Sequence, residues 1–450
     1  MLPVSRRRAR RLRIIVPVVV CLIVLHYLWN LSPSETTRQG TTVSTDKSTP
    51  ATSLPCNQLA GSEDVVLVLK TGATEALDRV PIHFDTTFRC APDHIIFSDF
   101  AEEIQGHPVY DCLRNVDDEI KNNHPDFELY NRLVENGRAT LDADELSGWT
   151  TNTDSNIGNL GNQGWRLDKW KFLPLVDEVL QKRPDAKWFF FMEADTYLVW
   201  SNLLSWIKHL DPNRPYYIGG QMQIGPVIFA HGGAGFLVSN PALRILSDYR
   251  STRIKELDKF TSDHWAGDCV LGKTMQDAGV PLTWSWPSVQ NERLSVFDHT
   301  AEVYNRRVWC HPAVTYHHMT SEAVESMWEF EQNWIGDTSS ILRHGDVFKN
   351  YLLPKFTDER DMWDNNSDSD KQEGYAGESF DDCRAACLAK PDCMQFSHSH
   401  DQCRISSIVR LGQKASKDQG RIRSGWMVER IHEMVRDMEP CGDAENWILE

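Results

Sequence analysis

The sequence has no Cys-x-x-Cys pair, no internal repeat and no cluster of basic residues outside its N-terminus. The missing Cys-x-x-Cys pair argues against a zinc site built from cysteines. The formal charge of −17 leaves the main body without the basic footprint that nucleic-acid binding requires. What the chain does have is 41% hydrophobic residues over 450 positions, which is enough for one large domain and a small one.

The N-terminus carries a membrane-targeting pattern. Six arginines between residues 6 and 13 precede an apolar run over 14–29. A cleaved signal peptide is one interpretation, since the run is shorter than the ~20 residues of a typical spanning helix. Bulky residues at 26–29 occupy the expected cleavage position, which favours a retained signal anchor. The positive-inside rule then places the basic tail, 1–13, in the cytosol and the rest of the chain in the lumen.

Ten of the eleven cysteines lie beyond this anchor, as expected for five disulfides in an oxidising lumen. Glycosylation sequons stand at Asn30 and Asn365. Asn30 is too close to the predicted membrane to be a good acceptor, whereas Asn365 lies in a polar stretch that is expected to be exposed.

Short apolar runs predict the core of the main domain. The runs at 65–69, 94–99 and 188–192 are typical of buried parallel strands. Amphipathic stretches predict helices over 173–181, from Asn240 towards Lys259, and from Asp268 to Gly279. This alternation predicts an α/β domain with a mostly parallel central sheet.

Composition sets the predicted boundaries. Residues 30–62, rich in Ser, Thr, Pro and Gln, are expected to form a flexible stem because they can bury little apolar surface. The α/β domain is predicted over 63–353, a polar linker over 354–371, a cysteine-dense domain over 372–430 and a tail over 431–450.

The motif Glu193-Ala194-Asp195 directly follows the most apolar predicted strand. Ligands of open α/β sheets bind at the carboxyl ends of strands, and carboxylates suit Mn²⁺ or Mg²⁺, which neutralise a diphosphate. Acidic residues at this position are also common as helix caps and turn formers. Three later features favour a ligand site over a simple cap or turn: a glycine-rich turn at 231–235, Asp268, and histidines at 311, 317 and 318.

Four blocks, taken in order, carry a family resemblance. They are Phe-Met-Glu-Ala-Asp-Thr-Tyr at 191–197, Gly-Gly-Ala-Gly-Phe-Leu-Val-Ser at 232–239, Gly-Asp-Cys-Val-Leu-Gly at 267–272 and Val-Thr-Tyr-His-His at 314–318. Together they resemble glycosyltransferase family 31, the Fringe and core 1 β1,3-galactosyltransferase group, over roughly 64–320. The resemblance implies a GT-A, Rossmann-like fold, a UDP-sugar donor, a divalent metal, usually Mn²⁺ and possibly Mg²⁺, and inversion at the anomeric carbon.

The resemblance also assigns metal ligands. Asp195 becomes the main carboxylate ligand, and Glu193 fills the first place of the family's Asp-x-Asp with one extra methylene. His317 matches the late histidine ligand, with His311 and His318 as competitors and an ordinary packed histidine as the alternative.

Asp268 matches the family's general base, which inversion requires within hydrogen-bond reach of the attacking hydroxyl. Gly267 stands where the family often has a second acid, so Asp268 is the one candidate at this place. A helix-capping role is compatible with the catalytic one.

Donor and acceptor contacts are expected at three further places. The region 164–171 resembles the family's tryptophan and lysine segment, so Lys169 or Lys171 is expected at the diphosphate, although solvated lysines are the commoner case. Trp284 and Trp286 are expected to offer an acceptor platform, with core packing as the alternative. The turn residues expected to approach the nucleotide sugar are Gly232, Gly233, Ala234 and Gly235.

The C-terminal cysteines follow the pattern Cys383-x3-Cys387-x5-Cys393-x9-Cys403. The pattern resembles a PAN or apple module, which implies a small disulfide-rich α+β domain that binds carbohydrate or protein. It also implies the pairs Cys383 with Cys403 and Cys387 with Cys393. For the other cysteines, the pairs favoured but not fixed by the sequence are Cys90 with Cys112, Cys269 with Cys310, and Cys56 with Cys441.

The expected protein is thus a type II membrane enzyme of the Golgi or endoplasmic reticulum. It would transfer a hexose, by resemblance galactose in a β1,3 linkage, from a UDP-sugar to a glycan or glycoprotein acceptor. One rival is a non-catalytic glycan-binding membrane protein with a degenerate transferase domain, and another is a metal-dependent hydrolase. No nucleic-acid partner is expected.

Overall fold

The computed structural model describes residues 56–147, 161–338, 340–367, 375–376, 379–400, 402–415, 420–442 and 445–449, which all fall in one compact unit. The predicted cytosolic tail and anchor, and most of the stem, lie outside these ranges. Within them, no helix combines the length and the apolar character needed to cross a membrane.

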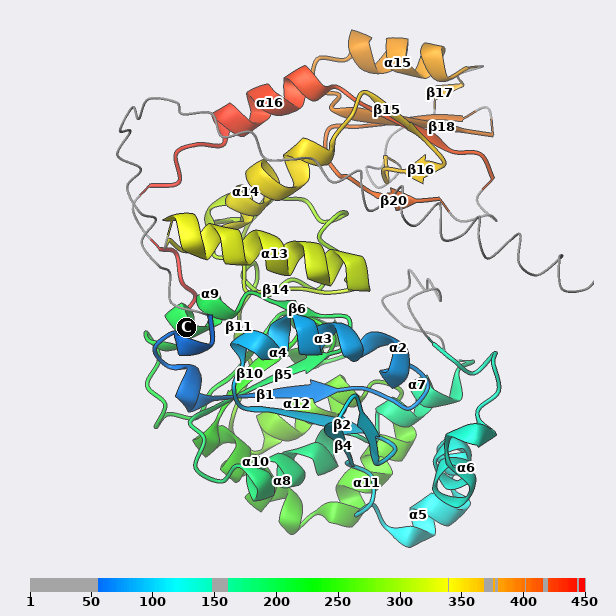
Figure 1. The fold of residues 1–450 in the computed structure, drawn as a ribbon, viewed down its shortest axis with the longest axis vertical. Helices are drawn as coiled ribbons and strands as arrows, with labels where there is room; N and C mark the ends of the chain where they lie inside the picture. Colours follow the sequence, from blue (N-terminus) through cyan, green and yellow to red (C-terminus); the bar gives the residue numbers. More distant parts are fainter. Residues whose placement is uncertain are drawn as a thin grey trace, which may run out of the picture. The chain divides into compact units, whose positions relative to one another are not determined.

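A mostly parallel sheet of eight strands forms the centre of the main domain (Figure 1). Across the sheet the order is β11 (Thr283–Trp284), β7 (Tyr217–Gly219), β10 (Phe236–Ser239), β5 (Trp188–Glu193), β1 (Val65–Lys70), β2 (His94–Ser98), β4 (His107–Asp111) and β3 (Glu102–Ile104). β5, β1, β2 and β4 are parallel, whereas β10 is antiparallel to β5. The three predicted apolar strands are therefore the adjacent strands β5, β1 and β2.

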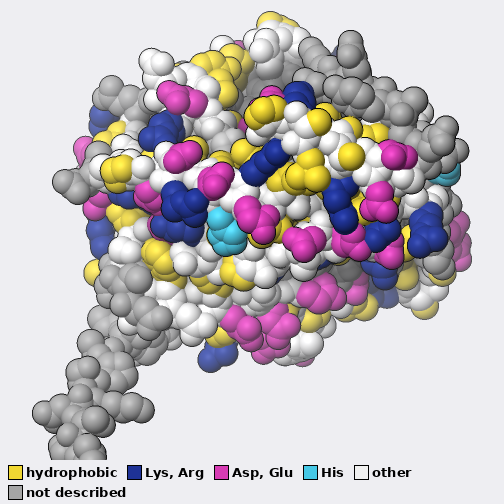
Figure 2. Space-filling model, turned by 90° about the horizontal axis from the view of Figure 1, so that it is seen from above, with side chains coloured by type: hydrophobic (Ala, Val, Ile, Leu, Met, Phe, Trp, Pro, Cys, Tyr) yellow, Lys and Arg dark blue, Asp and Glu magenta, His cyan; other side chains and the backbone are white. Residues whose placement is uncertain are grey.

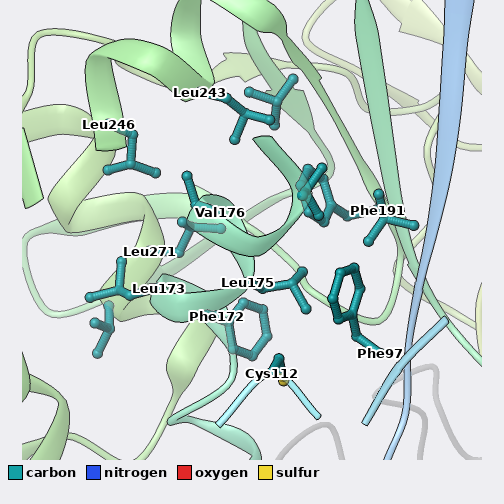
Figure 3. Close-up of a cluster of buried hydrophobic side chains, with 14 of the residues drawn as sticks. Phe97, Cys112, Phe172, Leu173, Leu175, Val176, Phe191, Leu243, Leu246 and Leu271 are labelled. Atoms are coloured by element: carbon teal, nitrogen blue, oxygen red, sulfur yellow. The ribbon is translucent and has the colours of Figure 1, made fainter. Parts of the chain in front are cut away.

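Helices cover both faces of this sheet. In β1, Val66 and Val68 enter one hydrophobic core and Val65, Leu67 and Leu69 the other, because successive side chains of a strand point to opposite faces. The first core packs under α8 (Phe172–Lys182), α10 (Asn240–Ser251) and α12 (Gly267–Asp277), as Figure 3 shows. The second packs under α3 (Pro81–Asp85), α4 (Thr87–Cys90) and α9 (Trp200–Ile207).

The helix predicted from Asn240 towards Lys259 is two helices, α10 and α11 (Ile254–Asp263). The other elements of this domain are short or lie at its edges. They are α2 (Ala76–Arg79), α5 (Asp118–Asn123), α6 (Glu128–Asn136), α7 (Gln163–Asp168), β6 (Tyr197–Leu198), β8 (Gln221–Ile224), β9 (Val227–Ala230), β12 (Glu302–Val303), β13 (Arg306–Arg307), β14 (Thr315–Tyr316), α13 (Ser321–Thr338) and α14 (His344–Val347).

A second, antiparallel sheet forms the C-terminal module, here residues 359–437. Its order is β15 (Glu359–Asp361), β21 (Arg423–Trp426), β18 (Gln395–Ser399), β19 (Gln402–Ser406) and β17 (Tyr375–Ala376), with α15 (Phe380–Ala389) packed on it and α16 (Val428–Asp437) following. The pair β16 (Trp363–Asp364) and β20 (Gln413–Lys414) completes it. The predicted linker, 354–371, therefore contains strands of the module, and the predicted tail, 431–450, begins inside α16.

Asn365 is fully buried, and its Nδ2 donates to the backbone oxygens of Phe396 at 3.1 Å and Gly425 at 3.3 Å. The expectation of an exposed sequon there is wrong. The polar side chain joins two strands of the module instead of facing solvent.

The described cysteines form four disulfides. Cys383 pairs with Cys403 and Cys387 with Cys393, as the resemblance implied. The other pairs are Cys56 with Cys90 and Cys310 with Cys441.

Three predicted pairs are wrong: Cys90 with Cys112, Cys269 with Cys310, and Cys56 with Cys441. Cys112 and Cys269 are free and buried. Cys112 lies in the core on the opposite face of the sheet from Cys90, close to Phe97 and Phe172 (Figure 3). Cys269 packs under β9, apart from the cluster that holds Cys310, so neither thiol can reach its predicted partner.

On the face drawn in Figure 2, acidic and basic side chains are interspersed with hydrophobic ones. The coloured residues of that face gather into no large basic patch.

Candidate functional site

A cleft of about 300 Å³ opens where β1 and β5 end. The carboxyl ends of parallel strands converge at one edge of a sheet, so this is the position that ligands take in open α/β folds. Lys70 ends β1 and Glu193 ends β5, and the two are direct partners in the parallel register. Both line the cleft, together with Asp195, Asp268 and His317.

Asp195, His317 and His318 form a group, here called the Asp-His-His cluster. One ligand atom from each lies within 4.8 Å of the others. The short antiparallel pair β6 and β14 brings them together, because Asp195 precedes β6 and the two histidines follow β14. The Met319 amide also donates to the Asp195 backbone oxygen at 2.9 Å, which closes the ribbon.

The Asp195 carboxylate is buried but not fully satisfied. Its Oδ2 accepts from Arg79 Nη1 at 3.2 Å, whereas its Oδ1 lies 3.4 Å from His317 Nε2 and has no hydrogen-bond partner. Burial alone would raise the pKa of Asp195, but the nearby His317, His318 and Arg79 hold it well below its usual range. An ionised carboxylate with an orphaned oxygen beside two imidazoles is a donor set that divalent transition ions accept.

Glu193 lies outside the Asp-His-His cluster. Its Oε1 forms an ion pair with Lys70 Nζ at 2.9 Å, and Lys70 Nζ also pairs with Asp168 Oδ2 at 2.6 Å. Burial opposes the charge of Lys70, but these two carboxylates outweigh it and raise the pKa of the ammonium. The structure thus separates the two acids of the motif: Asp195 faces the histidines and Glu193 holds a lysine.

The two lysines predicted at the diphosphate both have carboxylate partners. Lys171 is buried, pairs with Asp99 at 2.8 Å and donates to the Thr71 oxygen at 2.8 Å. Lys169 pairs with Asp126 at 2.9 Å. Both line the cleft, but their ammonium groups tie α7 and α8 to neighbouring segments.

The glycine-rich turn supports the site from behind. A side chain at Gly233 would place its Cβ 2.2 Å from His317 Nε2, so only glycine leaves room for the imidazole. The Gly232 amide donates to Asp268 Oδ2 at 3.0 Å. Gly233 lines the cleft, whereas Ala234 is fully buried and Gly235 adopts a positive φ of 80° beneath it.

Asp268 stands in the first turn of α12 and lines the cleft. Its carboxylate accepts from the amides of Gly232 and, at 2.8 Å, of Cys269. Burial raises the pKa of Asp268 to about 6, although both amide hydrogen bonds work against the shift. A carboxyl group with this pKa can accept a proton near neutral pH.

The predicted acceptor tryptophans lie outside the cleft. Trp284 and Trp286 each contact the Tyr304 ring edge-on, with centroids at 6.1 and 6.3 Å. The aromatic rings that do line the cleft include Trp165 and Trp265. His311 is neither part of the cluster nor among the residues that line the cleft, and its Nδ1 contacts the Arg307 oxygen at 2.8 Å.

The sequence interpretation missed Lys70, Arg79 and Trp265, although it had included Trp165 in the region 164–171. Lys70 carried a signal, because a lysine that ends an apolar strand run must find a partner or reach solvent. Arg79 and Trp265 carried none, since only the fold brings their segments to the end of β5.

Comparison with known proteins gives two matches to this chain. Residues 171–332, which include Asp195, Asp268 and His317, match the family model described as Fringe-like. Over 91 residues the chain is 31% identical to human chondroitin sulfate glucuronyltransferase, a match that covers 19% of this chain and 12% of that protein. Residues 171–332 are thus similar to the Fringe-like family, and part of the chain is similar to a glucuronyltransferase of which it spans only a small share.

Proposed function

We propose that the protein is an inverting, metal-dependent glycosyltransferase that uses a UDP-sugar. The observation that carries this proposal is the shared cleft. The Asp-His-His cluster, suited to a metal-bound diphosphate, lines the same cleft as Asp268, a carboxyl group suited to accept a proton.

A divalent ion, Mn²⁺ or Mg²⁺, fits the Asp195 carboxylate with its orphaned Oδ1 and the imidazoles of His317 and His318. When bound, such an ion neutralises charge on the departing nucleotide. Imidazole ligands favour Mn²⁺ over Mg²⁺, which is a harder ion and prefers oxygen.

The chain's own residues supply the other functions. Lys70 and Arg79 line the same cleft, where their ion pairs with Glu193 and Asp195 offset the negative charge of these carboxylates beside the place proposed for the diphosphate. Asp268 takes the proton of the attacking acceptor hydroxyl as that oxygen bonds to the anomeric carbon and UDP departs with the electrons of the broken bond.

Galactose and a β1,3 linkage are the donor and product inferred from family resemblance. The match to a protein named as a glucuronyltransferase makes UDP-glucuronate the second candidate donor. We also propose a type II anchor at 14–29 in the Golgi or endoplasmic reticulum membrane. For the C-terminal module we propose a PAN or apple-like role in binding carbohydrate or protein.

Calorimetric titration of the purified protein with UDP, with and without Mn²⁺, tests the proposal. We expect UDP binding that requires Mn²⁺, and a donor screen that follows UDP release should then identify the sugar. A protein without metal-dependent UDP binding is not this enzyme, and the glycan-binding alternative would take its place. Cleavage of a phosphate ester or glycoside without any sugar nucleotide would support the hydrolase alternative.

A further inference from the structure

The geometry points to an acceptor-sugar subsite formed by the aromatic pair Trp165 and Trp265 at the rim of the cleft. This inference rests on the proposed function, because it assigns the acceptor side of that reaction. Its ligand class is a pyranose that presents an apolar C–H face.

The two indole rings are nearly parallel but not in full face-to-face contact. Their planes differ by 18°, and their centroids lie 6.2 Å apart. Fully overlapped rings in contact would lie about 3.5–4 Å apart, so at 6.2 Å neither ring covers the whole face of the other. Trp265 is 42% exposed although it lines a cleft, which is unusual for so large an apolar side chain.

The pair is held in place by the segments that carry it. Trp165 lies in the first turn of α7, where its amide donates to the capping oxygen Asn162 Oδ1 at 3.1 Å. At the C-terminal end of α7, Lys169 Nζ donates to the Ser262 oxygen at 3.1 Å, which ties α7 to the end of α11.

Residues next to Trp265 fix its loop. The His264 ring lies nearly parallel to the Trp265 ring, at 13° and 6.2 Å, and His264 Nδ1 accepts from the Ala266 amide at 3.0 Å. A Cβ at Gly267 would come within 2.5 Å of the Lys169 Cα, so the loop packs tightly on α7. An aromatic surface fixed in advance loses little conformational entropy when it binds a ligand.

Position relative to Asp268 assigns the pair to the acceptor. Trp265 stands three residues before Asp268 in the sequence, and both line the cleft. The acceptor hydroxyl must come within hydrogen-bond reach of Asp268, so the ring that carries this hydroxyl lies beside the tryptophans. The donor diphosphate belongs at the Asp-His-His cluster and Lys70 instead.

Saturation-transfer NMR on the complete protein with Mn²⁺ and UDP tests the assignment. The probes are UDP itself and a panel of methyl pyranosides that covers the common hexoses and N-acetylhexosamines. We expect at least one glycoside to receive saturation on its C–H face in the unchanged protein. In Trp265→Ala and Trp165→Ala this signal should fall roughly tenfold while the UDP signal persists, and Trp265→Phe should retain part of it.

Tyr304→Ala is the comparison variant, because Tyr304 is a 68% exposed aromatic residue that does not line the cleft. Three results would overturn the subsite: no glycoside signal in the unchanged protein, an unchanged signal in Trp265→Ala, or a loss in Tyr304→Ala instead. Loss of the UDP signal in Trp265→Ala would also overturn it, by assigning the pair to the nucleobase. Failure of UDP to bind the unchanged protein would count against the proposed function and is read separately from the glycoside signals.

Discussion

Glu193 and Asp195 flank Ala194 in the sequence, yet their side chains have different partners. Asp195 faces two histidines and Arg79, whereas Glu193 is ion-paired with Lys70. The register of β1 and β5 makes this difference, because it sets Lys70 directly beside Glu193. The family resemblance predicted Asp195 as the main ligand and Glu193 as a second one, whereas the structure groups Asp195, but not Glu193, with the two histidines.

Metal affinity should therefore separate the two acids. We expect Asp195→Asn to weaken Mn²⁺ binding roughly 100-fold, since it removes the one carboxylate of the cluster. Glu193→Gln should change the affinity by less than about threefold, because its carboxylate contacts a lysine. Titration of free Mn²⁺ by electron paramagnetic resonance, without nucleotide, measures both. Equal losses in the two variants would show that Glu193 is a direct ligand.

The protonation of Asp268 predicts a pH profile. A general base acts when it is deprotonated, so activity is lost as pH falls through the pKa of about 6 that burial gives this carboxyl group. At saturating Mn²⁺ we expect kcat/KM to fall about tenfold per pH unit below 6 and to level off above it.

Asp268→Asn should lower transfer by about 100-fold or more while UDP still binds. Asp263→Asn is the matched control, since Asp263 is 61% exposed in its pair with Lys259. A flat profile between pH 5 and 7, or near-normal transfer by Asp268→Asn, would remove Asp268 from the base role.

At the scale of elements, strands were easier to predict than the contacts between their ends. The runs at 65–69, 94–99 and 188–192 identified β1, β2 and β5, because a strand buried on both faces is apolar throughout. The pair β6 and β14 consists of two-residue strands that are 118 positions apart at their first residues, Tyr197 and Thr315. The local sequence pattern does not predict such a pair, although this pair of strands assembles the Asp-His-His cluster.

The end of α15 depends on a single arginine of α16. Arg430 Nη1 donates to the backbone oxygens of Lys390 and Cys393, both at 2.8 Å, and Nη2 donates to Leu388 at 3.0 Å. A guanidinium satisfies the carbonyls that a helix leaves unpaired at its C-terminus and complements its dipole.

We expect Arg430→Met to lower the free energy of unfolding by about 1–3 kcal/mol, because it keeps the aliphatic stem but removes charged hydrogen bonds. Arg436→Met on the same helix should change it by less than about 0.5 kcal/mol, since Arg436 is 68% exposed in an i,i+3 pair. Urea denaturation followed by circular dichroism measures both. Similar values for the two variants would rule out the capping role.

At the scale of the molecule, the C-terminal module is joined to the main domain without a free linker. Arg410 Nε donates to the Val296 oxygen at 2.7 Å, and the Gly412 amide donates to the Ser295 oxygen at 2.8 Å. Arg293, which lines the cleft, is hydrogen-bonded to Gln413 of the module. The module is thus part of the scaffold behind the cleft.

The disulfides should stabilise this arrangement unequally. A crosslink restricts the unfolded chain in proportion to the logarithm of the loop that it closes. Cys310 and Cys441 are separated by 131 positions, whereas Cys387 and Cys393 are separated by 6. The double variant Cys310→Ser with Cys441→Ser should lower the free energy of unfolding by about 5 kcal/mol. The double variant Cys387→Ser with Cys393→Ser should lower it by about 2 kcal/mol. Guanidinium denaturation compares the two, and a larger loss for the shorter loop would contradict the expectation.

The sequence by itself predicted the α/β class and the three central strands from local pattern. Family resemblance added His317 and Asp268 as candidates, and the resemblance of the C-terminal segment added its nested disulfides. Only the tertiary structure decided the partner of Glu193, the position of His318 beside Asp195, the aromatic pair at the rim and the pairing of Cys310 with Cys441. Each of these depends on which face or edge of the sheet a distant segment reaches, and that choice is made by packing of the whole core rather than by any local sequence.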